Sequence, residues 1–503
     1  MKILKNQNVL VLGLGVSGLA MARWCVRCGA QVTVADTRLQ PPQLEALKRD
    51  VPSALFVNSD FTRGLFDDTA YNLLLVSPGI KPEEISKVIA VAKELGVVVT
   101  SELKLFSDAL MNLKETNAYA PDVLAITGTN GKTTVTSLTT KLIECSGKTA
   151  VMAGNIGPSL LDTLTEKLDA DMLPQVWVLE LSSFQLNEID GFEPTAGVVL
   201  NITQDHLDWH GTMQSYTRAK SRVFGSSGVM LLNREDATSS SMLQSALSVN
   251  KSRKYQTFGS DLPQNEGDYG LEFISGMAWL VRAMPSDENK TKRRIADKQI
   301  DKEIFIQRLM PSEALRIRGR HNSVNALVAL ALAEMAGCSL ASMLFGLREY
   351  RGEPHRVESV ALINGIEYFD DSKGTNVGAT VAALSGLGVD RKVILILGGE
   401  GKNQDFTPLV IPVKKFAKAI ILIGRDKQSI SAVLHNIKIP VVIAETMFDA
   451  VSIATGHAHT GDVILLSPAC ASFDMFENYE HRAKVFYDAV KSIAAQAGES
   501  VMS

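Results

Sequence analysis

Cysteine is scarce in this sequence. There are five cysteines in 503 residues, an odd number. A small and odd number argues against a disulfide framework and is typical of a reducing compartment. Cys25 and Cys28 have the spacing of a redox or zinc motif, but no second cysteine pair occurs in the sequence. We therefore interpret both as small buried thiols of a first helix.

Net positive charge and long apolar runs are also missing. The formal net charge is −4, which gives no broad basic field and excludes nucleic-acid binding as the main task. No run approaches the eighteen or so apolar residues that a membrane-spanning helix needs. Gly13, Gly15 and Gly18 interrupt the first apolar run, so we expect no signal peptide. These absences predict a soluble, cytoplasmic protein whose phosphate sites are local.

The most informative segment is 122–134, an apolar run followed by a glycine-rich turn. Gly128 and Gly131 let backbone N–H groups converge, and a following helix directs its positive end at a phosphate. Lys132 can neutralise phosphate charge, and Thr133 can offer a hydroxyl to Mg2+. The first glycine of the generic phosphate loop would fall at Ile126, so that pattern is incomplete. We interpret the segment as a nucleoside triphosphate site rather than a strand, turn and helix with a solvated lysine.

A second glycine-rich turn lies near the amino terminus. Gly13, Gly15 and Gly18 follow an apolar run at 8–12, and a second run ends in Asp36. This order is typical of a Rossmann-like unit. A dehydrogenase would place Asp36 on a ribose hydroxyl, but any nucleotide diphosphate could use the same helix terminus.

The middle of the chain offers candidate metal ligands. Glu180 ends an apolar run, where an α/β ATPase places its metal-side carboxylate. His206 and His210 are four residues apart, which suggests zinc, yet Mg2+ suits a loop beside a phosphate site better. A purely structural histidine pair stays open as an alternative. Composition alone makes Lys220 a solvated surface lysine.

These patterns predict an α/β fold with three domains: a Rossmann-like domain over 1–103, a central P-loop ATPase-like domain over 104–352, and a doubly wound Rossmann-like domain over 353–503. Residues from about 259 to 315 turn polar and irregular, and we expect an exposed insertion there. Its charge run at 286–294 mixes acids with bases, which argues against a nucleic-acid arm.

Several ordered motifs resemble those of the Mur ligases, ATP-dependent amide ligases of peptidoglycan precursor synthesis, over nearly the whole chain. The motifs are 128–134, 180–184, 205–208, 321–325, 354–356 and 371–373. Segments 36–38, 154–157, 373–376 and 467–472 are most similar to the family members that add D-glutamate. The resemblance implies that ATP activates the L-alanine carboxylate of UDP-N-acetylmuramoyl-L-alanine as an acyl phosphate, which D-glutamate then attacks. We expect a monomer.

The resemblance also implies residue roles. The implied catalytic residues are Lys132, His206, Lys220 and Lys373. Thr133 and Glu180 would hold one Mg2+, and His206 with a carbamylated Lys220 a second. The implied ATP-binding residues are Gly128, Thr129, Asn130, Gly131, Lys132, Thr133, Thr134, Asn322, Asn325, Arg356 and Asp371.

Two further sets would bind the other substrates. The UDP-substrate set is Ser17, Asp36, Thr37, Arg38, Gly79, Asn155 and His206. The D-glutamate set is Lys373, Thr375, Lys402, Ser472, Phe473 and Tyr479. Tyr479 departs from the phenylalanine that the family often has there.

Alternatives remain. A sibling ligase or a folylpolyglutamate-synthase-like enzyme would add a different amino acid. An NAD-dependent dehydrogenase would explain Asp36 but leave 128–134 and Glu180 without a role. A P-loop switch would need no amine-acceptor site.

Overall fold

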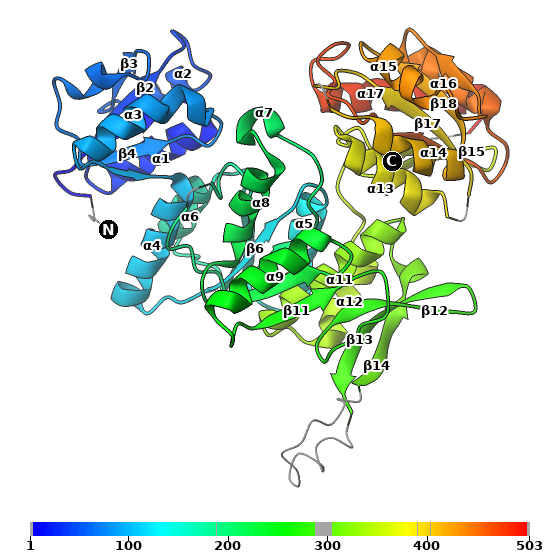
Figure 1. The fold of residues 1–503 in the computed structure, drawn as a ribbon, viewed down its shortest axis with the longest axis horizontal. Helices are drawn as coiled ribbons and strands as arrows, with labels where there is room; N and C mark the ends of the chain where they lie inside the picture. Colours follow the sequence, from blue (N-terminus) through cyan, green and yellow to red (C-terminus); the bar gives the residue numbers. More distant parts are fainter. Residues whose placement is uncertain (1–3, 188, 287–303, 390, 403, 500–503) are drawn as a thin grey trace.

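The computed structural model describes residues 4–187, 189–286, 304–389, 391–402 and 404–499. Three separate β-sheets, each covered by helices, follow one another along the chain. The first and third sheets lie in two outer domains on either side of the central one (Figure 1). Among the described residues, no helix combines the length and apolarity that a membrane crossing requires. The prediction of an α/β fold with three domains is confirmed.

The first domain holds a parallel five-stranded sheet of order β3-β2-β1-β4-β5. Its strands are β1 (Asn8–Leu12), β2 (Gln31–Asp36), β3 (Leu55–Asn58), β4 (Leu73–Val76) and β5 (Val98–Thr100), and its helices are α1 (Val16–Arg27), α2 (Leu44–Asp50) and α3 (Pro82–Glu94). Helices cover both faces, so the strands read as continuous apolar runs. Cys25 and Cys28 are free and fully buried at the end of α1, as predicted.

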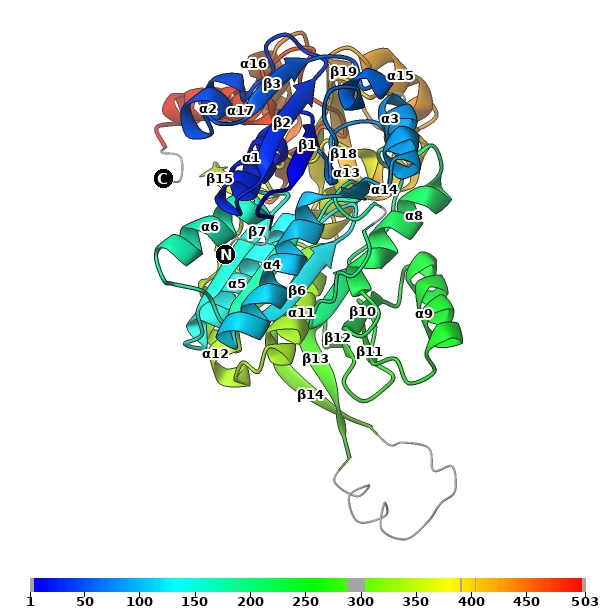
Figure 2. The same cartoon turned by 90° about the vertical axis from the view of Figure 1, so that its left-hand side faces the viewer.

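Helix α4 (Glu102–Asn117) leads from the first sheet to the second and packs against α6 (Leu160–Asp169) of the central domain. Figure 2 shows α4 running along the central domain below the first sheet. Helix α1 of the first domain contacts both α4 and α6, so the first and central domains pack directly against each other. The exact limits at 103 and 352 therefore stay predictions.

The central sheet has nine strands in the order β14-β13-β12-β11-β10-β9-β6-β8-β7. The strands are β6 (Asp122–Thr127), β7 (Ala150–Gly154), β8 (Val176–Glu180), β9 (Ala196–Val199), β10 (Val229–Asn233), β11 (Tyr255–Phe258), β12 (Tyr269–Ile274), β13 (Met277–Pro285) and β14 (Ile304–Pro311). The other helices are α5 (Lys132–Cys145), α7 (Leu207–His210), α8 (Met213–Ser221), α9 (Ala237–Val249), α11 (Arg320–Met335) and α12 (Leu340–Glu349). Strand β6 lies between β8 and β9, so its carboxyl end opens at the middle of the parallel part.

The expectation of an irregular segment over about 259–315 is wrong for most of its described residues. Strands β12, β13 and β14 form an antiparallel extension of the central sheet, which projects from the molecule in Figure 1. Ser275 and Gly276 have φ of 51° and 83°, as a tight two-residue hairpin requires. Leu280, Val281 and Ala283 of β13 are buried, so this stretch contributes to the core although the segment is polar on average. Of the charge run, residues 287–294 lie outside the described residues.

The third domain has a six-stranded sheet of order β15-β16-β20-β17-β18-β19, parallel except for the β15–β16 pair. Its strands are β15 (Glu358–Ile363), β16 (Ile366–Asp370), β17 (Val393–Gly398), β18 (Ala417–Ile423), β19 (Val441–Ile443) and β20 (Val463–Leu466). Its helices are α13 (Val377–Leu387), α14 (Val410–Phe416), α15 (Lys427–Leu434), α16 (Met447–His457) and α17 (Tyr479–Ala497). Buried clusters on both faces explain the apolar strands.

Candidate active site

The glycine-rich turn of the central domain connects β6 to α5. Gly128 and Gly131 have φ of 154° and 86°, which residues with a side chain rarely adopt. A Cβ on Gly128 would also lie only 2.9 Å from the Cβ of Leu200 on the neighbouring chain segment. The turn therefore brings backbone N–H groups to the amino terminus of α5, a geometry suited to phosphate.

Asn201 holds this turn in place. Its backbone carbonyl accepts from the Thr129 N–H at 2.9 Å, and its Oδ1 accepts from the Asn130 N–H at 2.9 Å. Its Nδ2 donates to the Asn130 carbonyl at 3.0 Å. Asn201 was not among the predicted site residues. The available signal was its place just after the apolar run of β9, beside the strand that carries the turn.

Two lysines donate to the same carbonyl of the turn. The Lys132 ammonium bonds the Gly128 and Thr129 carbonyls at 3.0 and 2.9 Å. The Lys220 ammonium bonds the Gly128 carbonyl at 2.8 Å and the Thr127 hydroxyl at 3.2 Å. Lys220 is only 2% exposed, so its interpretation from composition as a solvated surface lysine is wrong. Helix α8 turns this side chain inward beside the ring of Tyr216.

Charge at this point is not balanced. Within the described part of the chain, neither lysine has a carboxylate at ion-pair distance. Burial lowers the pKa of Lys132, and it lowers the pKa of Lys220 far more, with the charge of Lys132 adding to the effect at Lys220. Glu180 and Asp205 favour the charged form of both lysines from a longer distance, and an anionic ligand at the turn would stabilise that form directly.

Glu180 lies at the carboxyl end of β8, as predicted, and is 2% exposed. Its Oε1 accepts from the Asn155 side chain at 2.8 Å. Its Oε2 is buried and has no hydrogen-bond donor among the residues that the structure describes. A buried carboxylate oxygen without a partner is costly in the absence of a cation, so Glu180 fits a Mg2+ ligand.

His206 and His210 have different surroundings. His206 adopts φ of 52° just before α7, its ring packs on Phe184, and burial lowers its pKa. His210 is buried, its ring stacks on Phe184, and its Nε2 lies 2.9 Å from the Ser183 hydroxyl at hydrogen-bond distance. Its surroundings match the structural alternative that the sequence left open.

Helix α11 brings Asn322 and Asn325 to the turn. The Asn325 side chain lies against Gly131, where an added Cβ would be 3.0 Å from its Oδ1. The Asn325 amide also donates to Asn322 Oδ1 at 3.0 Å. These two amides offer neutral donors and acceptors beside the phosphate turn, as a nucleobase needs.

The third domain reaches the turn directly. Arg356 Nη2 donates to the Thr133 hydroxyl at 2.6 Å, and Asn376 Nδ2 donates to Asn130 Oδ1 at 3.2 Å. Asn376 was not predicted. Asp371 is buried and accepts from Ser467 at 2.7 Å, and burial raises its pKa to about 7. The two domains therefore meet at the phosphate turn.

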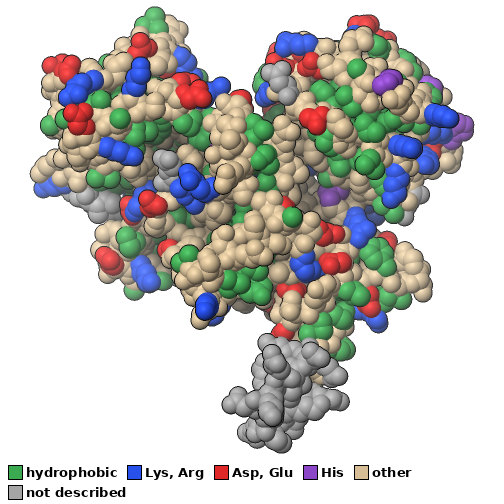
Figure 3. All heavy atoms as spheres, in the orientation of Figure 1, with side chains coloured by type: hydrophobic (Ala, Val, Ile, Leu, Met, Phe, Trp, Pro, Cys, Tyr) green, Lys and Arg blue, Asp and Glu red, His purple; other side chains and the backbone are tan. Residues whose placement is uncertain are grey.

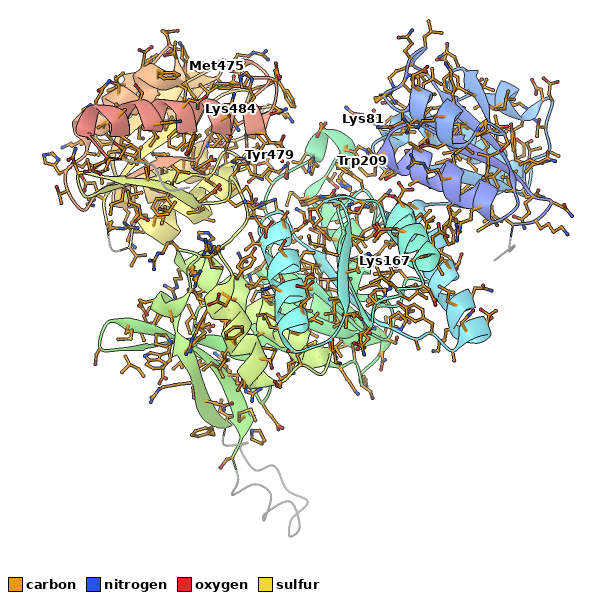
Figure 4. The ribbon with its side chains drawn as sticks, turned by 180° about the vertical axis from the view of Figure 1, so that it is seen from behind. Lys81, Lys167, Trp209, Met475, Tyr479 and Lys484 are labelled. Carbon is orange, nitrogen blue, oxygen red and sulfur yellow. The ribbon has the colours of Figure 1, made fainter. Side chains whose placement is uncertain are left out.

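The predicted D-glutamate residues lie in two groups at the ends of β16, β17 and β20. The Lys373 ammonium lies 3.5 Å from the centre of the Tyr479 ring. Lys402 lies 6.0 Å from the centre of the Phe473 ring, which is 65% exposed. Ser472 is buried and Thr375 is exposed. Figure 3 shows a hollow between the two outer domains, and Figure 4 places Tyr479 toward it.

The first domain meets the same loop from the other side. Trp209 Nε1 donates to the Ile80 carbonyl at 3.1 Å, and Lys81 lies 3.8 Å from Asp208. Figure 4 shows Lys81 and Trp209 together at this junction. Trp209 was not predicted. Gly79, a predicted UDP-substrate residue, immediately precedes this contact and has open space around it.

Asp36 organises the rest of the predicted UDP-substrate set. One oxygen accepts from the Leu14 N–H at 2.7 Å, and both accept from the Arg38 guanidinium at 2.7 and 2.8 Å. These donors keep the pKa of Asp36 low despite its burial. Thr37 and Asn155 are exposed, and Ser17 lies near the buried Glu102.

Comparison with known proteins assigns all three domains. Residues 7–101 match the Mur ligase MurD-like N-terminal domain, residues 126–333 the Mur ligase middle domain, and residues 355–470 the Mur ligase glutamate ligase domain. The UDP-N-acetylmuramoylalanine--D-glutamate ligase of Albidiferax ferrireducens is 58% identical over 99% of this chain and 98% of its own length. The enzyme of that name from Paraburkholderia xenovorans is 52% identical over 98% and 97%.

Solved structures share the fold. MurF from Acinetobacter baumannii has a TM-score of 0.57 at 17% identity, covering 97% of this chain and 92% of its own. The UDP-N-acetylmuramate-alanine ligase MurC from Thermotoga maritima has a TM-score of 0.52 at 19% identity, covering 97% and 100%. With domain models matched along most of its length and relatives above half identity, the chain belongs to the Mur ligase family.

Proposed function

We propose that this protein is the ATP-dependent ligase that adds D-glutamate to UDP-N-acetylmuramoyl-L-alanine during cytoplasmic synthesis of peptidoglycan precursors. The observation that carries the proposal is the charge pattern at the phosphate turn. Within the described residues, Lys132 and Lys220 form no direct ion pair with a carboxylate, Glu180 has an oxygen without a hydrogen-bond donor, and Arg356 of the third domain reaches Thr133. Relatives named for this activity, matched over 98% or more of the chain, support the choice of substrates.

The first step is activation of the alanine carboxylate, since a carboxylate is a poor electrophile. One carboxylate oxygen attacks the γ-phosphorus of ATP, the bond to ADP breaks, and an acyl phosphate forms. The backbone N–H groups at the amino terminus of α5 and the Lys132 ammonium neutralise the transferring group. Asn322 and Asn325 hold the adenine side, and Arg356 with Asp371 contributes from the third domain.

Divalent cations fit the residues present. Glu180 offers a buried carboxylate oxygen and Thr133 a hydroxyl at the start of α5, the oxygen ligands that Mg2+ prefers. Bound Mg2+ would neutralise phosphate charge and orient the transferring group. These two residues would hold the ion, and the hydrogen bond from Asn155 fixes the Glu180 carboxylate for that role.

Lys220 would contribute a metal ligand after its amine is converted to a carbamate. Burial lowers the pKa of the Lys220 amine well below its ordinary value, which favours the neutral form, and a neutral amine can add CO2. The product is an anionic oxygen ligand in place of a buried cation, which together with His206 would hold a second Mg2+. Carbamylation would also remove the unfavourable proximity of two ammonium groups at the Gly128 carbonyl.

The second step is amide formation. The D-glutamate amine attacks the acyl carbon, a tetrahedral intermediate forms, phosphate leaves, and the nitrogen loses a proton. Lys373, Thr375, Lys402, Ser472, Phe473 and Tyr479 bind and orient the amino acid. The UDP portion is held by Ser17, Asp36, Thr37, Arg38 and Gly79, and Asn155 with His206 approaches its peptide-bearing arm.

The test combines purified protein, ATP, Mg2+ and UDP-N-acetylmuramoyl-L-alanine, with phosphate release measured with and without D-glutamate. We expect release to depend on D-glutamate and mass spectrometry to find one new amide. L-glutamate, L-alanine and a diamino acid serve as matched controls. Release that ignores D-glutamate, or a preference for another amino acid, would overturn the proposal.

A further inference from the structure

Arg482, on the first turn of α17, is fully buried, with 0% of its surface exposed. Its guanidinium makes three hydrogen bonds. Nε donates to the Ser372 hydroxyl at 3.0 Å, and Nη2 donates to the Ser372 carbonyl at 2.8 Å. Nη1 donates to the Cys470 carbonyl at 3.1 Å. All its acceptors are therefore neutral.

The acceptors belong to two loops that are far apart in the sequence. Ser372 lies in the loop after β16 that carries Lys373, and Cys470 lies in the loop after β20 that carries Ser472. The Ser372 hydroxyl in turn donates to the Tyr479 carbonyl at 2.8 Å. One guanidinium thus connects both loops to each other and, through Ser372, to the start of α17.

The cost of burying the Arg482 charge indicates a role beyond filling space in the core. Within the described ranges, no carboxylate lies at ion-pair distance from Arg482, and burial lowers its pKa to about 10. Asp474, Asp370 and Asp371 stabilise the charge only from a longer distance. A buried cation without a direct ion pair costs stability, and an apolar side chain of similar volume would fill the space at lower cost. The planar guanidinium, unlike a lysine ammonium, holds several acceptors at fixed angles.

We propose that Arg482 is a positioning residue for the amino-acid acceptor: it fixes the spacing between Lys373, Ser472 and Tyr479. The proposal rests on the proposed function, which assigns these three residues to D-glutamate. Arg482 holds the two loops in place without contacting the substrate itself. The side chains that it positions, Lys373, Ser472 and Tyr479, contact the substrate. Loss of the guanidinium would let the loops separate and weaken D-glutamate binding selectively, since small displacements of positioning groups have large effects.

The experiment uses the full-length protein and compares Arg482→Lys and Arg482→Gln with Arg253→Lys. Arg253 is a matched control, because it is 8% exposed and bonds the Phe224 and Gly225 carbonyls at 2.6 and 3.1 Å in the central domain. KM is measured for D-glutamate, ATP and the UDP-substrate, together with the thermal midpoint. We expect both Arg482 variants to raise KM for D-glutamate about tenfold or more and the other two KM values by less than about twofold.

Arg253→Lys should lower the thermal midpoint without a selective change in any KM. Equal increases in all three KM values, or an unchanged KM for D-glutamate in Arg482→Lys, would overturn the proposal. If the Arg482 variants do not fold, Ser372→Ala provides the test, and we expect a selective rise of about threefold. An unchanged KM for D-glutamate in Ser372→Ala would then refute the positioning role. Failure of the wild-type protein to require D-glutamate would instead refute the proposed function.

Discussion

The two glycine-rich turns of this protein share a shape and differ in charge. Both connect a buried parallel strand to a helix, after β1 in the first domain and after β6 in the central one. In the first turn, Ser77 donates to the Gly13 carbonyl at 2.8 Å and Asp36 accepts from the Leu14 N–H at 2.7 Å. In the second turn, two ammonium groups share the Gly128 carbonyl.

A strand–turn–helix motif determines the backbone geometry of such a site, and other residues determine its charge. In the first domain, Asp36 and Arg38 form an ion pair, so their opposite charges neutralise each other beside the turn. At the second turn, Lys132 and Lys220 form no such ion pair in the described residues, and one Glu180 oxygen there has no hydrogen-bond donor. Both turns can bind a nucleotide portion through backbone geometry. Only the second has groups that gain from a transferring phosphate and a divalent cation.

The largest expected effect comes from removing charge at the second turn. Lys132→Ala should lower kcat on the order of 10³-fold, because the transferring phosphate loses its nearest cation. Phosphate release measures the effect. Lys141→Ala is the matched control, since Lys141 is an exposed lysine on the same helix. Similar activity in the two variants would mean that the comparison between the turns is wrong.

Lys220→Ala tests the other ammonium group. If carbamylation supplies a metal ligand, kcat should fall about 100-fold or more and recover in part with added acetate or formate, as the added carboxylate replaces the carbamate oxygen. Chloride at equal ionic strength is the control. A variant with near wild-type activity would refute the carbamate.

Asp36→Asn tests the balanced turn. We expect KM for the UDP-substrate to rise about tenfold with little change in kcat, because Arg38 and the turn lose the carboxylate that orders them. The free energy of unfolding should fall by about 1–3 kcal/mol. Asp60→Asn is a control at an exposed position of the same domain. A loss in kcat without a change in KM would place Asp36 in the chemistry instead.

The smallest effect at neutral pH concerns His321 on α11, whose ring lies against Gly386 of α13. Its Nδ1 is buried and has no hydrogen-bond partner among the described residues, and burial lowers its pKa from 6.5 to about 4. Below pH 6.5 the unfolded chain binds a proton that the folded protein does not, so stability should fall between pH 6.5 and 4. The loss is about 3 kcal/mol.

Urea unfolding at several pH values measures this loss. His321→Gln should remove it, and His435→Gln, at an exposed histidine, should not. An identical pH dependence in wild type and His321→Gln would contradict the assignment to His321.

Much of this organisation could be predicted from the sequence. Glycines, apolar runs and acidic strand ends have local signatures, so the three α/β domains, the turn at Gly128 and the position of Glu180 were predictable. The hairpin of β12 and β13 had a signature too, in the Ser275–Gly276 turn, which the polar composition obscured.

The remainder depends on contacts between distant segments. The burial of Lys220 follows from the way α8 packs behind the turn, and its neighbours in the sequence do not reveal this. The bonds of Asn201 and Asn376 to Asn130 cross between strands and between domains. No short sequence window contains both partners of such a contact.

Lys132 already donates hydrogen bonds to the Gly128 and Thr129 carbonyls, so its bonds to a nucleotide would have to replace these bonds. An arriving phosphate does not meet a free ammonium group, because the lysine must give up its two carbonyl acceptors. Its contribution to affinity is then the difference between two sets of hydrogen bonds and is small. The full electrostatic benefit appears only when phosphate charge shifts during transfer, so Lys132 should affect kcat far more than KM for ATP.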